Sequence, residues 1–63
     1  SEADMEKIKA LRAQKAGEMI NENYGDLQDL TDEEYASKVN SYYNKALKEA
    51  RNEVLPDGWK NEK

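Results

Sequence analysis

The sequence predicts an all-α protein, an antiparallel helical hairpin with one helix over about residues 2–24 and another over about 32–55. Three observations predict this fold. The 63 residues leave room for one small domain only, spanning 1–63. Apolar residues recur at helical spacing in two segments. A helix-start pattern at Thr31 separates the segments, and the single proline ends the second one.

The second segment carries the stronger helical signals. Thr31 and Glu34 have the spacing of a capping box, in which each side chain accepts a hydrogen bond from the other residue's backbone amide. Leu30 and Tyr35 flank that cap as a hydrophobic staple. Pro56 ends the helix, because it disfavours helical angles for the residue before it. The apolar positions fall on a stripe roughly 140° wide, typical of one core-facing side: Tyr35, Ala36, Val39, Tyr42, Tyr43, Ala46, Leu47, Ala50 and Val54.

The first segment has a narrower apolar stripe, made of Met5, Ile8, Leu11, Ala16, Met19 and Ile20. Arg12 and Lys15 interrupt it, so we expect their stems to lie along its edge with the charged ends in water. Gly17 costs about 1 kcal/mol relative to alanine inside a helix. Because Ala13, Ala16 and Gly17 cluster as small residues, we favour a close approach of the second helix at Gly17, and a frayed weak spot is the alternative.

The link and the tail are expected to complete the hairpin. Gly25 suits the position just after a helix end. Leu27 and Leu30 predict a short helical turn that packs onto the helices. Two helices bury only one face each, so such a unit needs a third element or a second copy. We expect Trp59, after a turn at residues 56–58, to fold back over the open end of the core, and insertion into a partner is the alternative.

Composition and charge exclude several classes of function. Ten Lys and Arg against fourteen Asp and Glu give a net charge of −4, which argues against binding nucleic acid or anionic membranes. The chain has no cysteine and no histidine, so thiolate metal sites and the commonest general base are missing. We predict no enzyme activity, no cofactor and no metal site. No apolar run approaches the ~20 residues of a membrane span. We expect a cytoplasmic protein, with a secreted protein whose signal has been removed as the alternative.

Tyrosines are the first candidate binding residues, because an aromatic ring with a polar tip suits an interface that is apolar on one side and wet on the other. Tyr42 and Tyr43 lie 100° apart on a helix and cannot both face the core. We expect Tyr35 and Tyr42 to pack in the core and Tyr43 to lie at an interface.

Acidic residues are the second candidate. Residues 24–37 hold five acids and no base: Asp26, Asp29, Asp32, Glu33 and Glu34. Their spacing lacks the alternate ligands and central glycine of a calcium loop. We expect a solvated region around the helix start, or an acidic patch that steers a basic partner. The carboxylate pairs Glu18 with Glu22 and Glu49 with Glu53 are expected on open helix surface, without the cleft that catalysis requires.

The sequence therefore predicts a non-enzymatic protein–protein interaction module. An acidic helical hairpin would dock through its apolar and tyrosine face onto another protein or onto itself. A two-fold dimer that forms a four-helix bundle is the form we favour. Its seam would include Tyr43, Leu47, Val54, Met5 and Ile8, with Trp59 as a further partner-binding residue. The alternative is a small acidic inhibitor or decoy, phage-type or antitoxin-like, that occupies a basic surface on its target through Asp26, Asp29, Asp32, Glu33 and Glu34.

Overall fold

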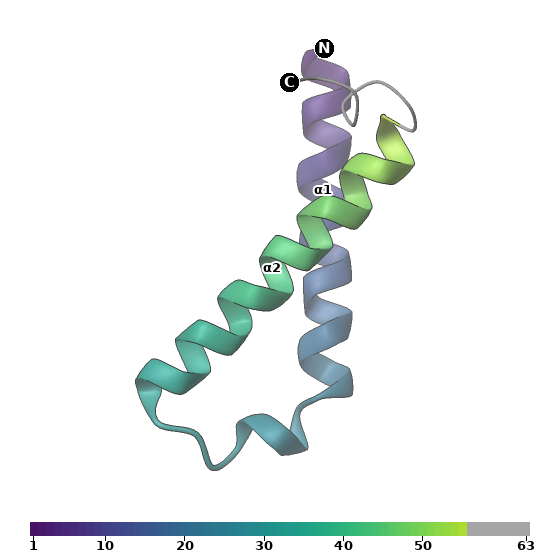
Figure 1. Ribbon diagram of the computed structural model, residues 1–63. Coiled ribbons are helices and arrows are strands. Elements are labelled where there is room, and N and C mark those ends of the chain that lie inside the picture. The colour runs from purple at the N-terminus through teal and green to yellow at the C-terminus, as the bar shows by residue number, and fades with distance from the viewer. Residues whose placement is uncertain (56–63) are drawn as a thin grey trace.

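A computed structural model describes residues 1–55. It contains two α-helices, α1 (Glu2–Glu22) and α2 (Asp32–Val54), with a short 3₁₀ turn, η1 (Gly25–Leu27), between them. The helices run antiparallel, cross near the middle of α1 and diverge towards the link (Figure 1). The predicted helical hairpin with a helical turn in the link is confirmed. Trp59, the predicted third element, lies outside the described residues.

Both helices begin at a capped residue. The Ser1 hydroxyl accepts a hydrogen bond of 3.3 Å from the backbone amide of Asp4. At the start of α2, the backbone amide of Thr31 donates to Glu34 Oε1 over 2.9 Å, and the amide of Glu34 donates to Thr31 Oγ1 over 3.1 Å. The predicted capping box is confirmed, so the boundary between the link and α2 is set by local sequence.

The end of α1 differs from the prediction. The helix stops at Glu22, and the Asn23 side-chain amide donates a 2.8 Å hydrogen bond to the carbonyl of Met19. The Met19 carbonyl also accepts from the Asn23 backbone amide over 3.1 Å, and the Tyr24 amide donates to the Asn21 carbonyl over 3.3 Å, so the helix ends at Asn23. Gly25 instead begins η1, and no glycine within residues 1–55 has a positive φ. The predicted role of Gly25 as the residue that ends the helix is wrong.

The core is thin and consists mostly of alanine. Ala16, Ala46 and Ala50 have no exposed surface. In a pair of helices, residues lose all exposure only where the two helices touch, so these alanines mark the contact. Ile8 and Leu27 complete the buried set, with 9% and 5% exposure. The closest packing of α1 on α2 therefore involves methyl groups, while larger apolar side chains lie beside it.

Gly17 is not the point of close approach. It is exposed, and a Cβ atom built on it would meet nothing within 4 Å. One residue along a helix turns the side chain by 100°, and Ala16 holds the inward position. The prediction placed the small residue one position too far along the chain.

The apolar stripe on α2 faces α1 along its C-terminal two-thirds. Ala46 and Ala50 are buried, and Val39 and Tyr42 are half-buried. Tyr35, expected in the core, is 44% exposed. The helices diverge towards the link, so α1 does not cover the first turn of α2 (Figure 1). The two-sided helix is confirmed, but its first turn lacks the predicted cover.

Candidate protein-docking groove

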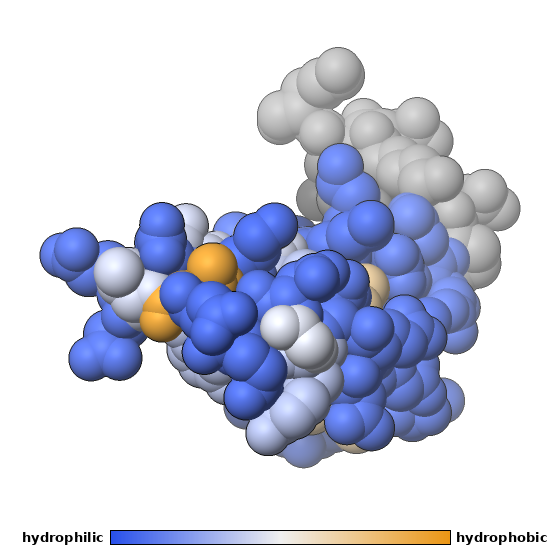
Figure 2. All heavy atoms as spheres, turned by 90° about the horizontal axis from the view of Figure 1, so that it is seen from below, coloured by the Kyte–Doolittle hydropathy of each residue, from blue (hydrophilic) through white to orange (hydrophobic). Residues whose placement is uncertain are grey.

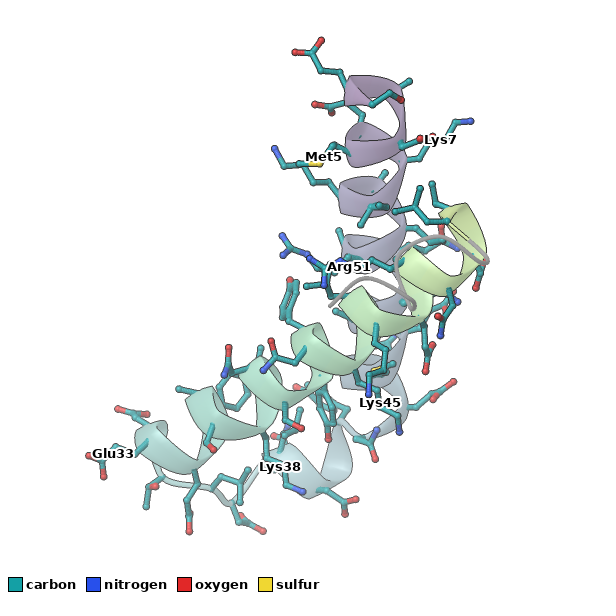
Figure 3. All side chains as sticks on the ribbon, turned by 45° about the horizontal axis from the view of Figure 1, so that its top comes forward. Met5, Lys7, Glu33, Lys38, Lys45 and Arg51 are labelled. Atoms are coloured by element: carbon teal, nitrogen blue, oxygen red, sulfur yellow. The ribbon has the colours of Figure 1, made fainter. Side chains whose placement is uncertain are left out.

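A groove lies between the N-terminal half of α1 and the C-terminal half of α2. Its volume is about 220 Å³, and its lining residues are Met5, Ile8, Lys9, Arg12, Leu47 and Arg51. We call it the Met5 groove. Met5 is 61% exposed. Figure 3 shows Met5 and Arg51 on one side of the hairpin, whereas Lys7 points to the other. The groove thus combines an apolar surface with several positive charges.

Tyr43 borders this groove through a contact with Arg12. The guanidinium carbon of Arg12 lies 5.7 Å from the centroid of the Tyr43 ring, within the range of a cation–π interaction. Tyr43 retains 37% exposure, at the margin position that the sequence predicts for an interface residue. Arg12 Nε is buried and has no hydrogen-bond partner. Within residues 1–55, no carboxylate lies within ion-pair distance of Arg12.

The opposite flank of the helix pair is closed by ion pairs. Lys15 Nζ lies 2.6 Å from Glu53 Oε2 and 3.8 Å from Glu49 Oε1. The hydrogen bond to Glu53 raises the pKa of Lys15, and the negative charges of Glu53, Glu49 and Glu18 add to this effect against partial desolvation. The two glutamates expected on open surface therefore link α2 to α1, which gives this carboxylate pair a structural role.

A second, larger cleft lies nearer the link. Its volume is about 440 Å³, and it is lined by Lys15, Glu18, Met19, Glu22, Asn23, Ser41, Tyr42, Lys45 and Glu49. Two lysines face three glutamates here, so the cleft has little net charge with which to select a ligand. Within residues 1–55, no group of three acidic side chains is placed to hold a metal ion.

The predicted acidic residues gather at the link end of the molecule. All five are exposed: Asp26, Asp29, Asp32, Glu33 and Glu34. No ion pair between described residues includes any of them. Seen from the link end, the surface is mostly hydrophilic with small separate apolar spots (Figure 2). This end is a solvated acidic surface, distant along the hairpin from the Met5 groove (Figure 1).

The structure brings together only part of the predicted seam. Met5, Ile8 and Leu47 line one groove. Val54 is half-buried and lines a different groove, together with Leu11. Lys9 and Arg12 were missed as site residues, although the interruption of the apolar stripe by Arg12 was a usable signal. The other predicted binding residue, Trp59, lies beyond residue 55.

None of the helices within residues 1–55 is long and apolar enough to cross a lipid bilayer. Comparison with protein-family models, with curated proteins and with solved structures finds no match to this chain.

Proposed function

We propose that the protein is a non-enzymatic protein-interaction module that docks through the Met5 groove and the adjoining Tyr43. One observation carries the proposal. The helices meet through alanines, and two larger apolar side chains on this flank stay exposed, Met5 at 61% and Tyr43 at 37%. Burying apolar surface is favourable by about 25 cal/mol per Å², so a partner that covers this flank gains affinity.

The occupant is another protein or a second copy of the chain. A two-fold dimer with the groove on its axis would bring Lys9 and Arg12 of both copies together. Like charges at a desolvated interface oppose association. The basic lining of the groove therefore favours a different protein, and the dimer expected from the sequence stays a prediction.

A second candidate function uses the other end of the molecule. The five link acids, 26–34, are exposed and form no ion pairs with other described residues. They would suit a decoy for a basic surface on a target protein. Such binding would weaken steeply with added salt, because solvent-exposed charges are screened.

A displayed library of helical peptides, randomised without charge bias, tests the proposal on the full chain. We expect the selected peptides to shift the backbone NMR signals of Met5, Ile8, Tyr43 and Leu47. Tyr43→Ala should weaken their binding at least fivefold. Tyr24→Ala is the matched control, because Tyr24 is 62% exposed but lies in the link. Peptides that bind at the link acids, or no selected peptide at all, would contradict the proposal.

Light scattering over a concentration series decides whether a second copy occupies the groove. A constant mass of 7.3 kDa leaves the groove for a different protein. A rise towards twice that mass, abolished by Tyr43→Ala but not by Tyr24→Ala, assigns it to a second copy.

A further inference from the structure

We propose that the Met5 groove receives an acidic amphipathic helix of another protein, with apolar side chains against Met5, Ile8 and Leu47 and a carboxylate on Arg12. This inference rests on the proposed function and adds the chemistry of the partner. It depends on three features of the described residues: the local charge of the groove, the state of Arg12, and the contrast between the two flanks of the hairpin.

The charge of the groove is opposite to that of the whole chain. The protein carries a net charge of −4. Yet the described residues that line the groove include Lys9, Arg12 and Arg51 and no acid. A positive concave surface on a negative protein attracts acidic segments and repels basic ones during association. Lys9 and Arg12 are the groups of this groove that meet the partner.

Arg12 is held in place but is not satisfied within residues 1–55. Its guanidinium group lies over the ring of Tyr43, and its buried Nε has no hydrogen-bond partner. A guanidinium ordered on an aromatic ring presents a planar fork that matches a carboxylate. Because the ring already restricts the side chain, a carboxylate binds Arg12 at a smaller cost in conformational entropy than it would a free arginine.

On the opposite flank of the hairpin, a cation of α1 is paired with acids of α2. Lys15, three residues after Arg12 on α1, has two carboxylates of α2 within 4 Å. No described carboxylate of α2 serves Arg12 in this way. One flank of the hairpin thus supplies its own acids, whereas the other leaves this role to a partner.

A helix fits the shape of this site. The groove lies between two crossing helices, and its α1 residues are spaced three and four apart, at Met5, Ile8 and Arg12. Such spacing forms a ridge against which a third helix packs. The bound helix would also give the two-helix unit of residues 1–55 a third element to pack against.

The peptide library described above also tests this inference, because its sequences are unbiased in charge. We expect Asp and Glu to be enriched beside the apolar anchors of the selected peptides. Replacing those acids by Asn and Gln should weaken binding at least tenfold. Replacing them by Lys should abolish it.

Substitution at Arg12 tests whether this residue causes the preference for acidic peptides. Arg12→Met should bind the acidic and amide forms of a peptide equally, while Arg12→Lys should keep part of the difference. Lys7→Met is the matched control, because it removes a cation on the opposite side of α1 (Figure 3). Circular dichroism of each variant should show unchanged helix content.

The outcomes separate this inference from the proposed function. Peptides that bind the groove equally well as acids or amides overturn the inference and leave the interaction module standing. The absence of any groove-binding peptide overturns both. If peptides bind the Trp59→Ala variant but not the wild type, the groove is occupied by residues 56–63 of the chain itself. If peptide binding is lost at the protein concentrations at which light scattering shows a dimer, the groove is occupied by a second copy. Either result contradicts an acidic partner helix.

Discussion

Lys15 in α1 and Glu53 in α2 form the shortest ion pair between described residues, with 2.6 Å between Nζ and Oε2. The two residues lie 38 positions apart in the sequence. The pair therefore reports directly on whether the helices are together.

Stability should depend on the charge of Lys15 at high pH. Its pKa is raised in the folded protein above the ordinary value of 10.5, chiefly by the hydrogen bond to Glu53. A raised pKa gives stability that is fully present below the unfolded-state pKa and is lost as pH rises through the folded-state pKa. In urea unfolding, the wild type should exceed Lys15→Met in stability by a constant amount from pH 7 to 9, and the difference should shrink above pH 10.5. Lys45→Met is the matched control, because no ion pair between described residues includes Lys45.

Enlarging the alanine contact should destabilise the hairpin. Ala46 has no exposed surface, so Ala46→Leu has no space for its added carbons and should cost about 1–3 kcal/mol in the free energy of unfolding. Ala36→Leu is the matched control on the same helix, at an exposed position, and should change stability by less than about 0.5 kcal/mol. Equal effects in urea unfolding would show that the helices do not meet at Ala46.

Gly17→Ala should stabilise the protein by about 0.5–1 kcal/mol. The added methyl group meets no atom within 4 Å, and alanine lowers the conformational entropy lost when the helix forms. A higher urea midpoint with an unchanged m-value is the expected result. A lower urea midpoint would instead support the close approach of the second helix that the sequence predicts at this residue.

Removing the capping box should shorten or weaken α2. Thr31→Ala deletes the acceptor of the Glu34 amide and should cost about 1 kcal/mol. Ser37→Ala, at an exposed position inside the helix, is the control and should be neutral or slightly stabilising. Hydrogen exchange of the Glu34 amide should accelerate in the first variant only.

Local signals made the fold predictable. The capping box at Thr31 and the apolar spacing of α2 depend on residues within a few positions of each other, and both are confirmed. The structural positions of Gly17, Gly25 and Tyr35 were not predictable from such local signals. The positions of Gly17 and Tyr35 depend on where the helices cross. Gly25 lies two residues past the C-cap Asn23, inside η1.

The candidate site was predictable only in its apolar half. Helical periodicity identifies Met5, Ile8 and Leu47 as members of the stripes, and the structure places them in one groove. Periodicity does not tell on which side of the crossing a stripe residue lies, so it could not separate Val54, which lines a different groove, from these three residues. It also treats Arg12 as an interruption, whereas its value as a site residue depends on the ring of Tyr43 from the other helix.

The alanine contact between the helices has a calorimetric consequence. Methyl groups have few atoms with which to form dispersion contacts, so separating the helices absorbs little heat. We expect an unfolding enthalpy below the value of about 0.7 kcal/mol per residue common to globular proteins. A small enthalpy spreads melting over a wide span of temperature, so the share of opened hairpins should rise gradually on warming instead of at a sharp threshold.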